Sequence, residues 1–528
     1  MGIYLNPGNE RFQESINSEI LVDKTGLIDY TNKRVKTEQK YLCISRPRRF
    51  GKSMAAHMLC AYYDRSCDSR AMFEGLEIAS APSFEKYLNK YNVIFINMQE
   101  FLSESDNINE LLNLLSARVI RDLKREYPGY LEPDEKNLMF ALMDIYSYTK
   151  SGFVFIIDEW DCIFRENRND QEAQNKYLDF LRNLLKDKVY VSLAYMTGIL
   201  PIKKYGTHSA LNMFDEISMT NANGADRFMG FTESEVKALC DKYGMDFSET
   251  QRWYDGYILE EAGHVYSPRS VVASMLSRRF DSYWTKTETY EALKVYIDLD
   301  FDGLKAEIVS MLAGGRYKVN TLRFSNDMTT FANKDDVFTL LIHLGYLGYD
   351  SVSKECFIPN EEIRQEYVNA MTDKKWQSVI SSLERSDSLL EALLDGDAEA
   401  VAAGIDAVHS DTASILSYNN ENTLSCVISL AFYSARDSYI IKRELPTGKG
   451  FADIVFIPLK HINKPAIVIE LKWDKSAEGA ISQIKDKNYC GSILDYTGDI
   501  ILAGINYDKD SKKHTCIIER INKDFSAY

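Results

Sequence analysis

The triplet Gly51-Lys52-Ser53 stands between a short apolar run at residues 41–45 and a helical pattern at residues 54–63. A turn that binds phosphate needs a strand, inward-facing backbone N–H groups and a helix that begins at the anion. Its lysine reaches the terminal phosphates, and the hydroxyl after it coordinates Mg²⁺. The spacing therefore predicts an ATP site with Mg²⁺. The residues predicted to contact the nucleotide are Arg49, Phe50, Gly51, Lys52, Ser53 and Met54.

One position departs from the usual pattern of such turns, G-x-x-x-x-G-K-[ST]. Arg46 stands where the first glycine is expected, and Pro47 follows it. A side chain at this position can crowd the loop or change its geometry. The triplet alone also occurs by chance in surface loops, so the prediction depends on the order strand, turn, helix.

A second apolar run, residues 153–157, ends in the carboxylates Asp158 and Glu159. In an enzyme with a phosphate-binding turn, an aspartate here holds Mg²⁺ through water, and a glutamate directly after it polarises the attacking water. The alternative is a strand that ends in solvent with charged residues. Thr197 follows a further apolar run at residues 189–196. It is either a sensor of the γ-phosphate or a turn residue, and both interpretations stay open.

Carboxylates and a lysine also combine near the C-terminal end. Asp453 precedes an apolar run, and Glu470-Leu471-Lys472 ends another. Side chains alternate along a strand, so Glu470 and Lys472 share one face and Leu471 takes the other. A glutamate deep in an apolar strand is costly unless it is paired. Two carboxylates that bind Mg²⁺, with a group that orients water, would suit phosphodiester cleavage.

The elements that must position the first group alternate between strands and helices. Helical patterns at residues 108–125 and 173–186 separate the strand-like runs, which predicts a parallel α/β sheet with right-handed crossovers. The strand-like runs are residues 41–45, 92–98, 153–157 and 189–196.

The second half has a different organisation. Residues 335–347 and 377–405 have helical patterns, and the acidic stretch in the latter is typical of a solvated helix face. The order α-β-β-β-α-β then predicts a separate C-terminal α/β domain. Its strands are expected at 439–445, 452–457, 466–471 and 499–505, and its helices at 423–437 and 476–489. We expect domains at residues 1–284, 285–400 and 401–528, the middle one mainly helical.

Several motifs together make the chain resemble a known family. They are RPRRFGKS (46–53), Asp23-Lys24-Thr25, DEWD (158–161), WYDGY (253–257) and VYSPRS (265–270). In order, they resemble the bacterial AAA-ATPase-like family, in which arginine also replaces the first glycine of the turn. Members typically carry a C-terminal domain of the PD-(D/E)xK nuclease superfamily, which has a restriction-endonuclease-like fold. The resemblance covers almost the whole chain.

This resemblance implies roles for further residues. Asp453 and Glu470 would be metal ligands on a β-hairpin, and Lys472 would orient water or stabilise charge. Gln483 matches a family glutamine that points toward the site, or it is an ordinary residue of a helix surface. Glu421 resembles the acidic residue that completes the centre. Alternatively, it is an acid in the first turn of a helix, where the helix dipole favours it.

Composition narrows the setting. The net charge of −16 argues against a generally basic DNA-coating surface, but it does not exclude a nuclease, because a bound metal supplies local positive charge. The nine cysteines include no CxxC pair, which favours reduced thiols. No apolar stretch approaches the roughly 18–20 residues of a membrane span. We therefore expect a cytoplasmic protein.

The leading hypothesis is an ATP-regulated, Mg²⁺-dependent nuclease. Nucleic acid is the expected partner, DNA rather than RNA, and we allow for a homo-oligomer. A second hypothesis is a signalling or scaffold ATPase whose nuclease-like domain binds without cutting. In a third, the turn altered by arginine holds no nucleotide.

Overall fold

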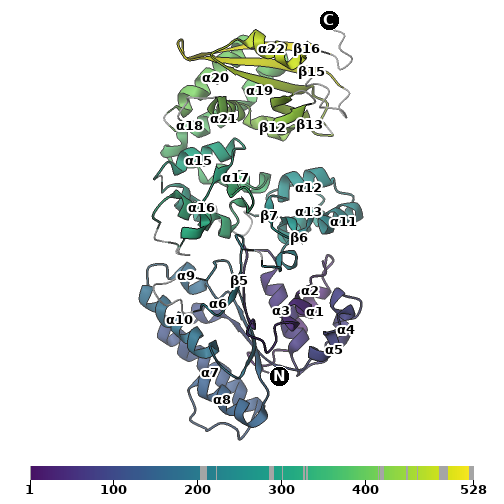
Figure 1. The fold of residues 1–528 in the computed structure, drawn as a ribbon, viewed down its shortest axis with the longest axis vertical. Coiled ribbons are helices and arrows are strands. Elements are labelled where there is room, and N and C mark those ends of the chain that lie inside the picture. Colours follow the sequence, from purple (N-terminus) through teal and green to yellow (C-terminus); the bar gives the residue numbers. More distant parts are fainter. Residues whose placement is uncertain are drawn as a thin grey trace. The chain divides into compact units, whose positions relative to one another are not determined.

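The computed structural model of the protein (Figure 1) describes residues 2–202, 211–221, 223–284, 291–299, 301–324, 328, 331–413, 415–416, 421–447, 450–460, 462–486 and 498–521, without the side chains of residues 291, 421, 422, 446, 447, 450 and 451. The chain packs as two compact units. One comprises Met1–Glu288 and Lys318–Ile363, and the other comprises Thr289–Tyr317 and Arg364–Tyr528. The domain boundaries expected at residues 284 and 400 stay predictions.

A five-stranded parallel sheet forms the centre of the first unit. Its order is β2-β3-β4-β1-β5. All four predicted strands are present, and their apolar runs are buried because helices cover both faces of the sheet. The α/β class predicted for this half is therefore confirmed. The strands are β1 (Tyr41–Ser45), β2 (Asn92–Asn97), β3 (Phe153–Asp158), β4 (Val191–Gly198) and β5 (Asp215–Ile217).

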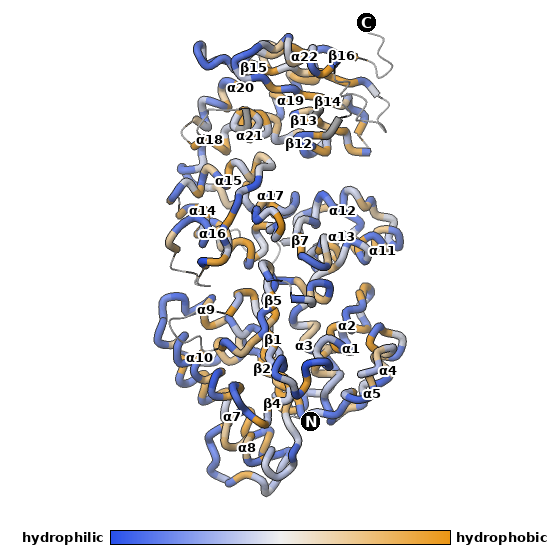
Figure 2. The backbone as a smooth tube through the Cα atoms, viewed as in Figure 1, coloured by the Kyte–Doolittle hydropathy of each residue, from blue (hydrophilic) through white to orange (hydrophobic). Residues whose placement is uncertain are grey.

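Helices flank this sheet, with α1 to α5 on one side and α6 to α10 on the other (Figure 1). The long outer helices α7 and α10 alternate hydrophilic and hydrophobic positions (Figure 2), and their apolar residues face the interior. The helices are α1 (Glu10–Ile16), α2 (Gly26–Asn32), α3 (Lys52–Tyr63), α4 (Arg70–Phe73), α5 (Phe84–Tyr87), α6 (Met98–Ser103), α7 (Ile108–Glu126), α8 (Leu138–Thr149), α9 (Cys162–Glu166) and α10 (Gln171–Leu185).

A smaller subdomain with its own hydrophobic core follows β5. Tyr254 and Tyr257 of the WYDGY motif are buried here. Its small antiparallel sheet has the order β6-β8-β7. The elements are β6 (Phe231–Thr232), α11 (Glu233–Tyr243), α12 (Phe247–Tyr254), β7 (Tyr257–Leu259), β8 (Gly263–Tyr266) and α13 (Pro268–Ser277).

The middle of the chain is mainly helical, as predicted. The helix expected at residues 335–347 is α16, and three helices occupy the segment 377–405 and its continuation. Gly396 has φ +81° and ends α19, so the acidic stretch is divided between two helices. The elements are α14 (Glu291–Ile297), α15 (Leu304–Leu312), α16 (Lys334–Leu344), β10 (Gly348–Asp350), β11 (Glu355–Phe357), α17 (Glu361–Ala370), α18 (Gln377–Glu384), α19 (Ser386–Asp395) and α20 (Ala398–Thr412).

The C-terminal domain has a mixed five-stranded sheet in the order β12-β13-β14-β15-β16. Only β14 and β15 are parallel, and α22 connects them. The predicted order α-β-β-β-α-β is confirmed, and the edge strand β16 is an addition. The elements are α21 (Glu421–Ala431), β12 (Tyr439–Thr447), β13 (Gly450–Pro458), β14 (Ala466–Trp473), α22 (Ala477–Asp486), β15 (Ile500–Asp508) and β16 (Lys513–Ile521).

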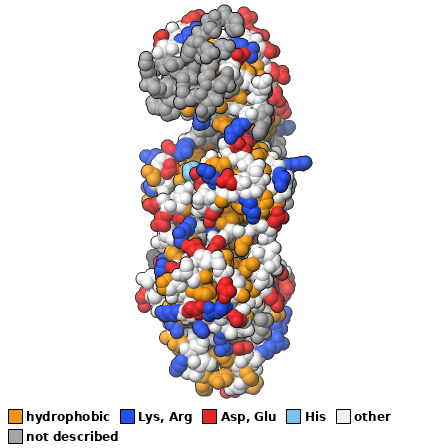
Figure 3. Space-filling model, turned by 90° about the vertical axis from the view of Figure 1, so that its right-hand side faces the viewer, with side chains coloured by type: hydrophobic (Ala, Val, Ile, Leu, Met, Phe, Trp, Pro, Cys, Tyr) orange, Lys and Arg blue, Asp and Glu red, His pale blue; other side chains and the backbone are white. Residues whose placement is uncertain are grey.

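Two expectations about the setting can be compared with the structure. Among the described helices, none has the length and apolar content that a membrane crossing requires. All eight cysteines in the described part of the chain are free thiols. Figure 3 shows acidic and basic side chains interspersed over the visible face.

Glu362 joins three segments of the first unit from a buried position at the start of α17. Its carboxylate accepts hydrogen bonds from the backbone N–H groups of Tyr283 (2.7 Å) and Trp284 (2.9 Å). The other oxygen accepts one from the hydroxyl of Ser270 on α13 (2.8 Å). Burial raises the pKa of Glu362 from 4.5 to about 7, although these hydrogen bonds oppose the shift.

We expect Glu362 to make the protein less stable as the pH rises. Below its ordinary pKa of 4.5 the group is protonated in both states, whereas above about 7 the folded state must hold a buried charge. This contribution to the free energy of unfolding is about 3 kcal/mol at most and is lost between these two pH values. Glu362→Gln should remove this pH dependence of the free energy of unfolding. Denaturant unfolding of the full chain between about pH 5 and about pH 8 measures it.

The control is Glu260→Gln, which changes an exposed glutamate of the same unit. It should keep the pH dependence of the wild type. An identical pH dependence in Glu362→Gln and in the wild type would contradict the prediction.

Candidate functional site

The turn between β1 and α3 has the geometry of an anion-binding loop. Gly51 caps α3 with φ +86°, in the left-handed region where glycine is favoured. Its carbonyl accepts the N–H of Ala55 (3.0 Å), which begins the helical hydrogen bonding. The N–H groups of the first residues of a helix have no partner within it. In this turn they lie at the positive end of a twelve-residue helix.

Lys52 places a buried ammonium group at this turn. Its Nζ donates hydrogen bonds to the carbonyl oxygens of Arg46 (3.0 Å) and Pro47 (2.8 Å). Burial lowers the pKa of Lys52, and the nearby carboxylates, Glu159 first, oppose this shift. The lysine therefore presents a cation inside the loop, close to the acidic ends of other strands.

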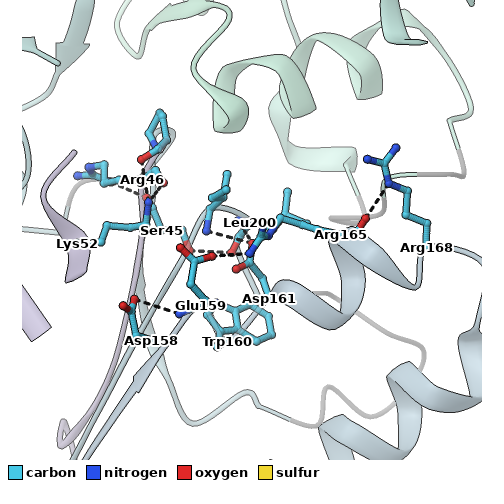
Figure 4. A network of polar contacts seen from close by, with 12 residues as sticks. Ser45, Arg46, Lys52, Asp158, Glu159, Trp160, Asp161, Arg165, Arg168 and Leu200 are labelled. Atoms are coloured by element: carbon cyan, nitrogen blue, oxygen red, sulfur yellow. Dashed lines mark hydrogen bonds and ion pairs between the residues drawn. The ribbon is translucent and has the colours of Figure 1, made fainter. Parts of the chain in front are cut away.

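Arg46, the departure from the usual turn, is fully buried. Its guanidinium donates to the carbonyl of Ser45 (3.1 Å), as Figure 4 shows. It also lies 3.7 Å from Asp226 Oδ1. Its backbone N–H donates to the carbonyl of Gly198 (3.1 Å), which extends the pairing of β1 with β4. Burial lowers the pKa of Arg46 to about 10, and Asp226 opposes this shift. Arg46 is therefore a paired interior residue.

Asp158 ends β3 beside the turn. Its side chain is 1% exposed and hydrogen-bonds with Ser53. Burial raises the pKa of Asp158, while the bond with Ser53 and the charge of Lys52 oppose the shift. The structure thus brings together the two residues predicted to hold Mg²⁺ at the nucleotide. A hydroxyl and a carboxylate are oxygen donors of the kind that Mg²⁺ prefers.

Glu159 continues from Asp158 with φ +54°, which is uncommon for a residue other than glycine. Its carboxylate forms an ion pair with Arg165 of α9, shown in Figure 4. Burial raises the pKa of Glu159, and Arg165 opposes this shift. Arg165 also lies 3.3 Å from Asp161. Sequence reasoning gave Arg165 no role, since an arginine in a charged helical segment is not distinctive.

The end of β4 is tied to the same group. Asp161 Oδ2 accepts the backbone N–H groups of Ile199 (3.1 Å) and Leu200 (2.8 Å). A β-carbon at Gly198 would lie 2.6 Å from Asp161 Oδ1 and 2.7 Å from the ring of Trp160, so only glycine fits there. Thr197 is fully buried, and its hydroxyl has no hydrogen-bond partner among the described residues. Its two interpretations, sensor or turn residue, remain predictions.

A cavity of about 430 Å³ opens beside the turn. Arg49, Phe50, Gly51 and Met54 line it, all of which were predicted to contact the nucleotide. Its other walls, from Ile20–Val22 and α13, were not predicted, although both adjoin motifs of the resemblance, Asp23-Lys24-Thr25 and VYSPRS. Lys24 also lines the cavity. Its Nζ donates hydrogen bonds to both carboxylate oxygens of Glu235 (2.8 Å and 2.6 Å) and to the carbonyl oxygen of Arg227 (2.7 Å).

The C-terminal carboxylates lie on adjacent antiparallel strands. In the register of β13 and β14, Ile454 pairs with Ile469, so the next position places Asp453 across from Glu470. Asp453 Oδ2 accepts the backbone N–H of Leu471 (2.7 Å). Strand pairing thus brings the two predicted metal ligands together.

Glu470 is the buried centre of a polar group in this domain. It is 1% exposed, and its Oε1 accepts hydrogen bonds from Lys472 Nζ (2.8 Å) and from Gln483 Nε2. Gln483 therefore points from α22 toward Glu470, and its role at a site stays a prediction. Lys472 and Glu470 share a face, as the strand alternation predicts.

The donor set of this group fits a hard divalent cation such as Mg²⁺, because Asp453 and Glu470 offer carboxylate oxygens. The described residues contain no group of three or more His, Cys, Asp or Glu side chains that could hold a metal. Glu421 begins α21, but its side chain lies outside the described part of the chain. Its role as an acid that completes the centre stays a prediction.

Comparisons with known proteins give a relative of similar length and solved structures of low similarity. The chain is 23% identical to an uncharacterized protein encoded in the vnfD 5′ region of Azotobacter chroococcum mcd 1, over 93% of both chains. It is similar to the ORC2 protein of Aeropyrum pernix (11% identity, 67% of this chain, 96% of that one, TM-score 0.31). It is also similar to AMPPCP-bound DnaA from Aquifex aeolicus (13% identity, 71% of this chain, 94% of that one, TM-score 0.25). Structural similarity at this level carries no argument about function.

Two family models match separate parts of the chain. Residues 8–207 match the model described as "Predicted AAA-ATPase". Residues 419–516 match the model of the PD-(D/E)XK nuclease superfamily. The first range contains the phosphate-binding turn and the DEWD motif, and the second contains Asp453, Glu470 and Lys472. The chain therefore combines an AAA-ATPase-like domain with a C-terminal domain of the PD-(D/E)XK nuclease superfamily.

Proposed function

We propose that the protein is an ATP-regulated, Mg²⁺-dependent nuclease that acts on DNA. The observation that carries this proposal is the group of Asp453, Glu470, Lys472 and Gln483 on two paired strands and the next helix, in which Glu470 and Lys472 are buried. A buried carboxylate beside a buried lysine is costly unless the arrangement has a use. Such a group suits a metal-dependent hydrolytic centre.

For the nucleotide, the proposed contacts follow from the turn. Lys52 and the N-terminus of α3 would bind the phosphates, and Ser53 and Asp158 would hold Mg²⁺, which neutralises charge on the phosphates. The neighbouring cavity of about 430 Å³ has the volume of a small-molecule site and offers apolar walls to an adenine base. Glu159 would polarise water, and Thr197 would sense the γ-phosphate.

For cleavage, Asp453 and Glu470 would hold Mg²⁺. A bound Mg²⁺ supplies Lewis-acid polarisation of the phosphate and a water of lowered pKa. Lys472 would orient the water or stabilise the charge that develops on the phosphate. Gln483 would keep the carboxylate of Glu470 in place by donating to its Oε1.

Regulation by nucleotide is supported by the path of the chain. The chain passes between the two compact units three times, since residues 289–317 belong to the second unit and residues 318–363 to the first. Three covalent connections therefore link the two units. This supports coupling between the nucleotide site and the nuclease domain.

Lys52→Ala should weaken ATP binding. The change removes the buried cation of the turn, and the loss of one charge-assisted contact corresponds to roughly a tenfold or larger increase in Kd. Isothermal titration of the full chain with ATP and Mg²⁺ measures this. The control is Lys176→Ala, which removes an exposed lysine of α10. An unchanged Kd in Lys52→Ala would support the hypothesis that this turn holds no nucleotide.

Glu470→Gln should abolish metal-dependent cleavage. The variant keeps the shape of the side chain but removes the charge that binds Mg²⁺, so we expect a loss of at least about a hundredfold. Gel assays with Mg²⁺ or Mn²⁺ on single- and double-stranded DNA, and on RNA, measure the rate and the preferred substrate. The control is Glu478→Gln, which changes an exposed glutamate of α22.

Persistent cutting by Glu470→Gln would place the nuclease site elsewhere. A wild-type chain that binds ATP and DNA but cuts neither DNA nor RNA would favour the alternative function. In that case the protein would be a signalling or scaffold ATPase whose nuclease-like domain binds without cutting.

ATP should change the cleavage rate of the wild type by several-fold, because the proposed coupling requires that the nucleotide favours one state of the protein. In Lys52→Ala the rate with ATP should equal the rate without ATP. Initial rates at saturating ATP test this. If ATP has the same effect on both proteins, the regulation does not pass through this turn.

A further inference from the structure

We infer that Arg165 is a positioning residue for Glu159 and fixes the orientation in which this glutamate polarises water during ATP hydrolysis. This inference rests on the proposed ATP site. It goes beyond that site because it assigns a role in hydrolysis to a residue outside the phosphate-binding turn and the DEWD motif.

The contact between the two residues is partly buried. Arg165 Nη2 bonds Glu159 Oε2, and the arginine side chain is 7% exposed, against 24% for the glutamate. The short helix α9 therefore places the guanidinium of Arg165, which is largely buried, against the more exposed carboxylate of Glu159 (Figure 4). The ion pair engages Oε2, so the carboxylate can turn its other oxygen toward a water molecule.

The backbone of Glu159 is fixed as well. Its φ of +54° is in the left-handed region, which costs about 1 kcal/mol or more for a residue with a β-carbon. The N–H of Glu159 donates to Asp158 Oδ1 (3.0 Å), and its carbonyl accepts the N–H of Cys162 (3.1 Å). Strain of this kind persists where the surroundings determine the conformation. With Arg165 at the far end of the side chain, Glu159 is held at both ends.

Arg165 is itself anchored to a second carboxylate. Its Nε lies 3.3 Å from Asp161 Oδ2, the oxygen that also accepts the N–H groups of Ile199 and Leu200. These residues directly follow Thr197-Gly198 at the end of β4. Arg165 therefore bridges Glu159 and the carboxylate that fixes the β4 end, and the two acidic side chains have a fixed relation to each other.

A structural role alone does not explain this choice of residues. A buried ion pair is often no more stabilising than apolar side chains of similar volume. An arginine that orients a catalytic carboxylate instead follows the general logic in which a third group aligns the base that acts on the nucleophile. A misplacement of the order of 1 Å at such a site can reduce a rate by about a hundredfold.

The test compares ATP hydrolysis by the full chain, with and without DNA, in Arg165→Gln, Arg165→Lys, Glu159→Gln and the double variant Glu159→Gln/Arg165→Gln. We expect Arg165→Gln to lower kcat by roughly ten- to a hundredfold and to leave the ATP Kd within about threefold. Arg165→Lys, which keeps the charge, should restore part of the rate. Arg182→Gln, which changes an exposed arginine of α10, should hydrolyse ATP like the wild type.

The double variant separates positioning from folding. If Arg165 acts through Glu159, the double variant should have the kcat of Glu159→Gln, because the arginine then has nothing to orient. The inference is overturned if Arg165→Gln keeps the wild-type kcat, or if it lowers kcat equally in the Glu159→Gln background. If thermal unfolding shows that Arg165→Gln does not fold, Arg165→Lys takes its place. It is then measured alone and in the Glu159→Gln background, and the same two criteria apply.

Failure of the inference and failure of the proposed ATP site have different signatures. A chain that binds ATP but hydrolyses none, with or without DNA, overturns the inference and leaves nucleotide binding intact. A chain that binds no ATP overturns the proposed site, and the inference with it.

Discussion

The register of three parallel strands is the constraint on which the N-terminal site depends. β4 lies between β1 and β3, and its pairing sets Ser45 beside Gly198 and Asp158 beside Thr197. Parallel strands end at the same edge of the sheet, so the turn after β1, the carboxylates after β3 and the end of β4 must meet there. A slip of one residue in either pairing would displace one strand end from the others by about 3.3 Å and separate the polar groups at this edge.

Both sites contain a buried charged group that polar partners stabilise. Lys52 in one site and Glu470 in the other are charged groups with little exposed surface, and each is surrounded by partners of opposite charge or by hydrogen-bonding groups. Burial makes a charge costly but also strengthens its effect on a nearby ligand, because little water screens it. Such groups are therefore well suited to bind phosphate or a metal ion.

The sequence predicted the elements better than it predicted what the side chains contact. The four strands of the N-terminal sheet and the order of the C-terminal domain follow from apolar runs and alternation. The strand β16 was missed because its sequence, KHTCIIERI, mixes charges with apolar residues, as an exposed edge strand does.

The partner of Arg46, Asp226, lies 180 residues away, and no local pattern reveals such a contact. Arg165 was overlooked for a different reason: it lies only six residues from Glu159, but the turn that brings the two side chains together has no distinctive sequence pattern. Gln483 was left open, and the packing of α22 against β14 and β15 decides its direction.

The interleaved path of the chain also constrains how the protein is made. The ribosome releases residues 289–317, a segment of the second unit, before residues 318–363, the last segment of the first unit. The first unit therefore cannot complete its packing until residue 363 has emerged, although its central sheet ends near residue 217. During that interval the early segment of the second unit has no partner, because most of its unit has not been synthesised. Folding from the N-terminal end, domain by domain, is the usual order for long chains. In this protein the order must be interrupted, and the two units become complete only late in synthesis.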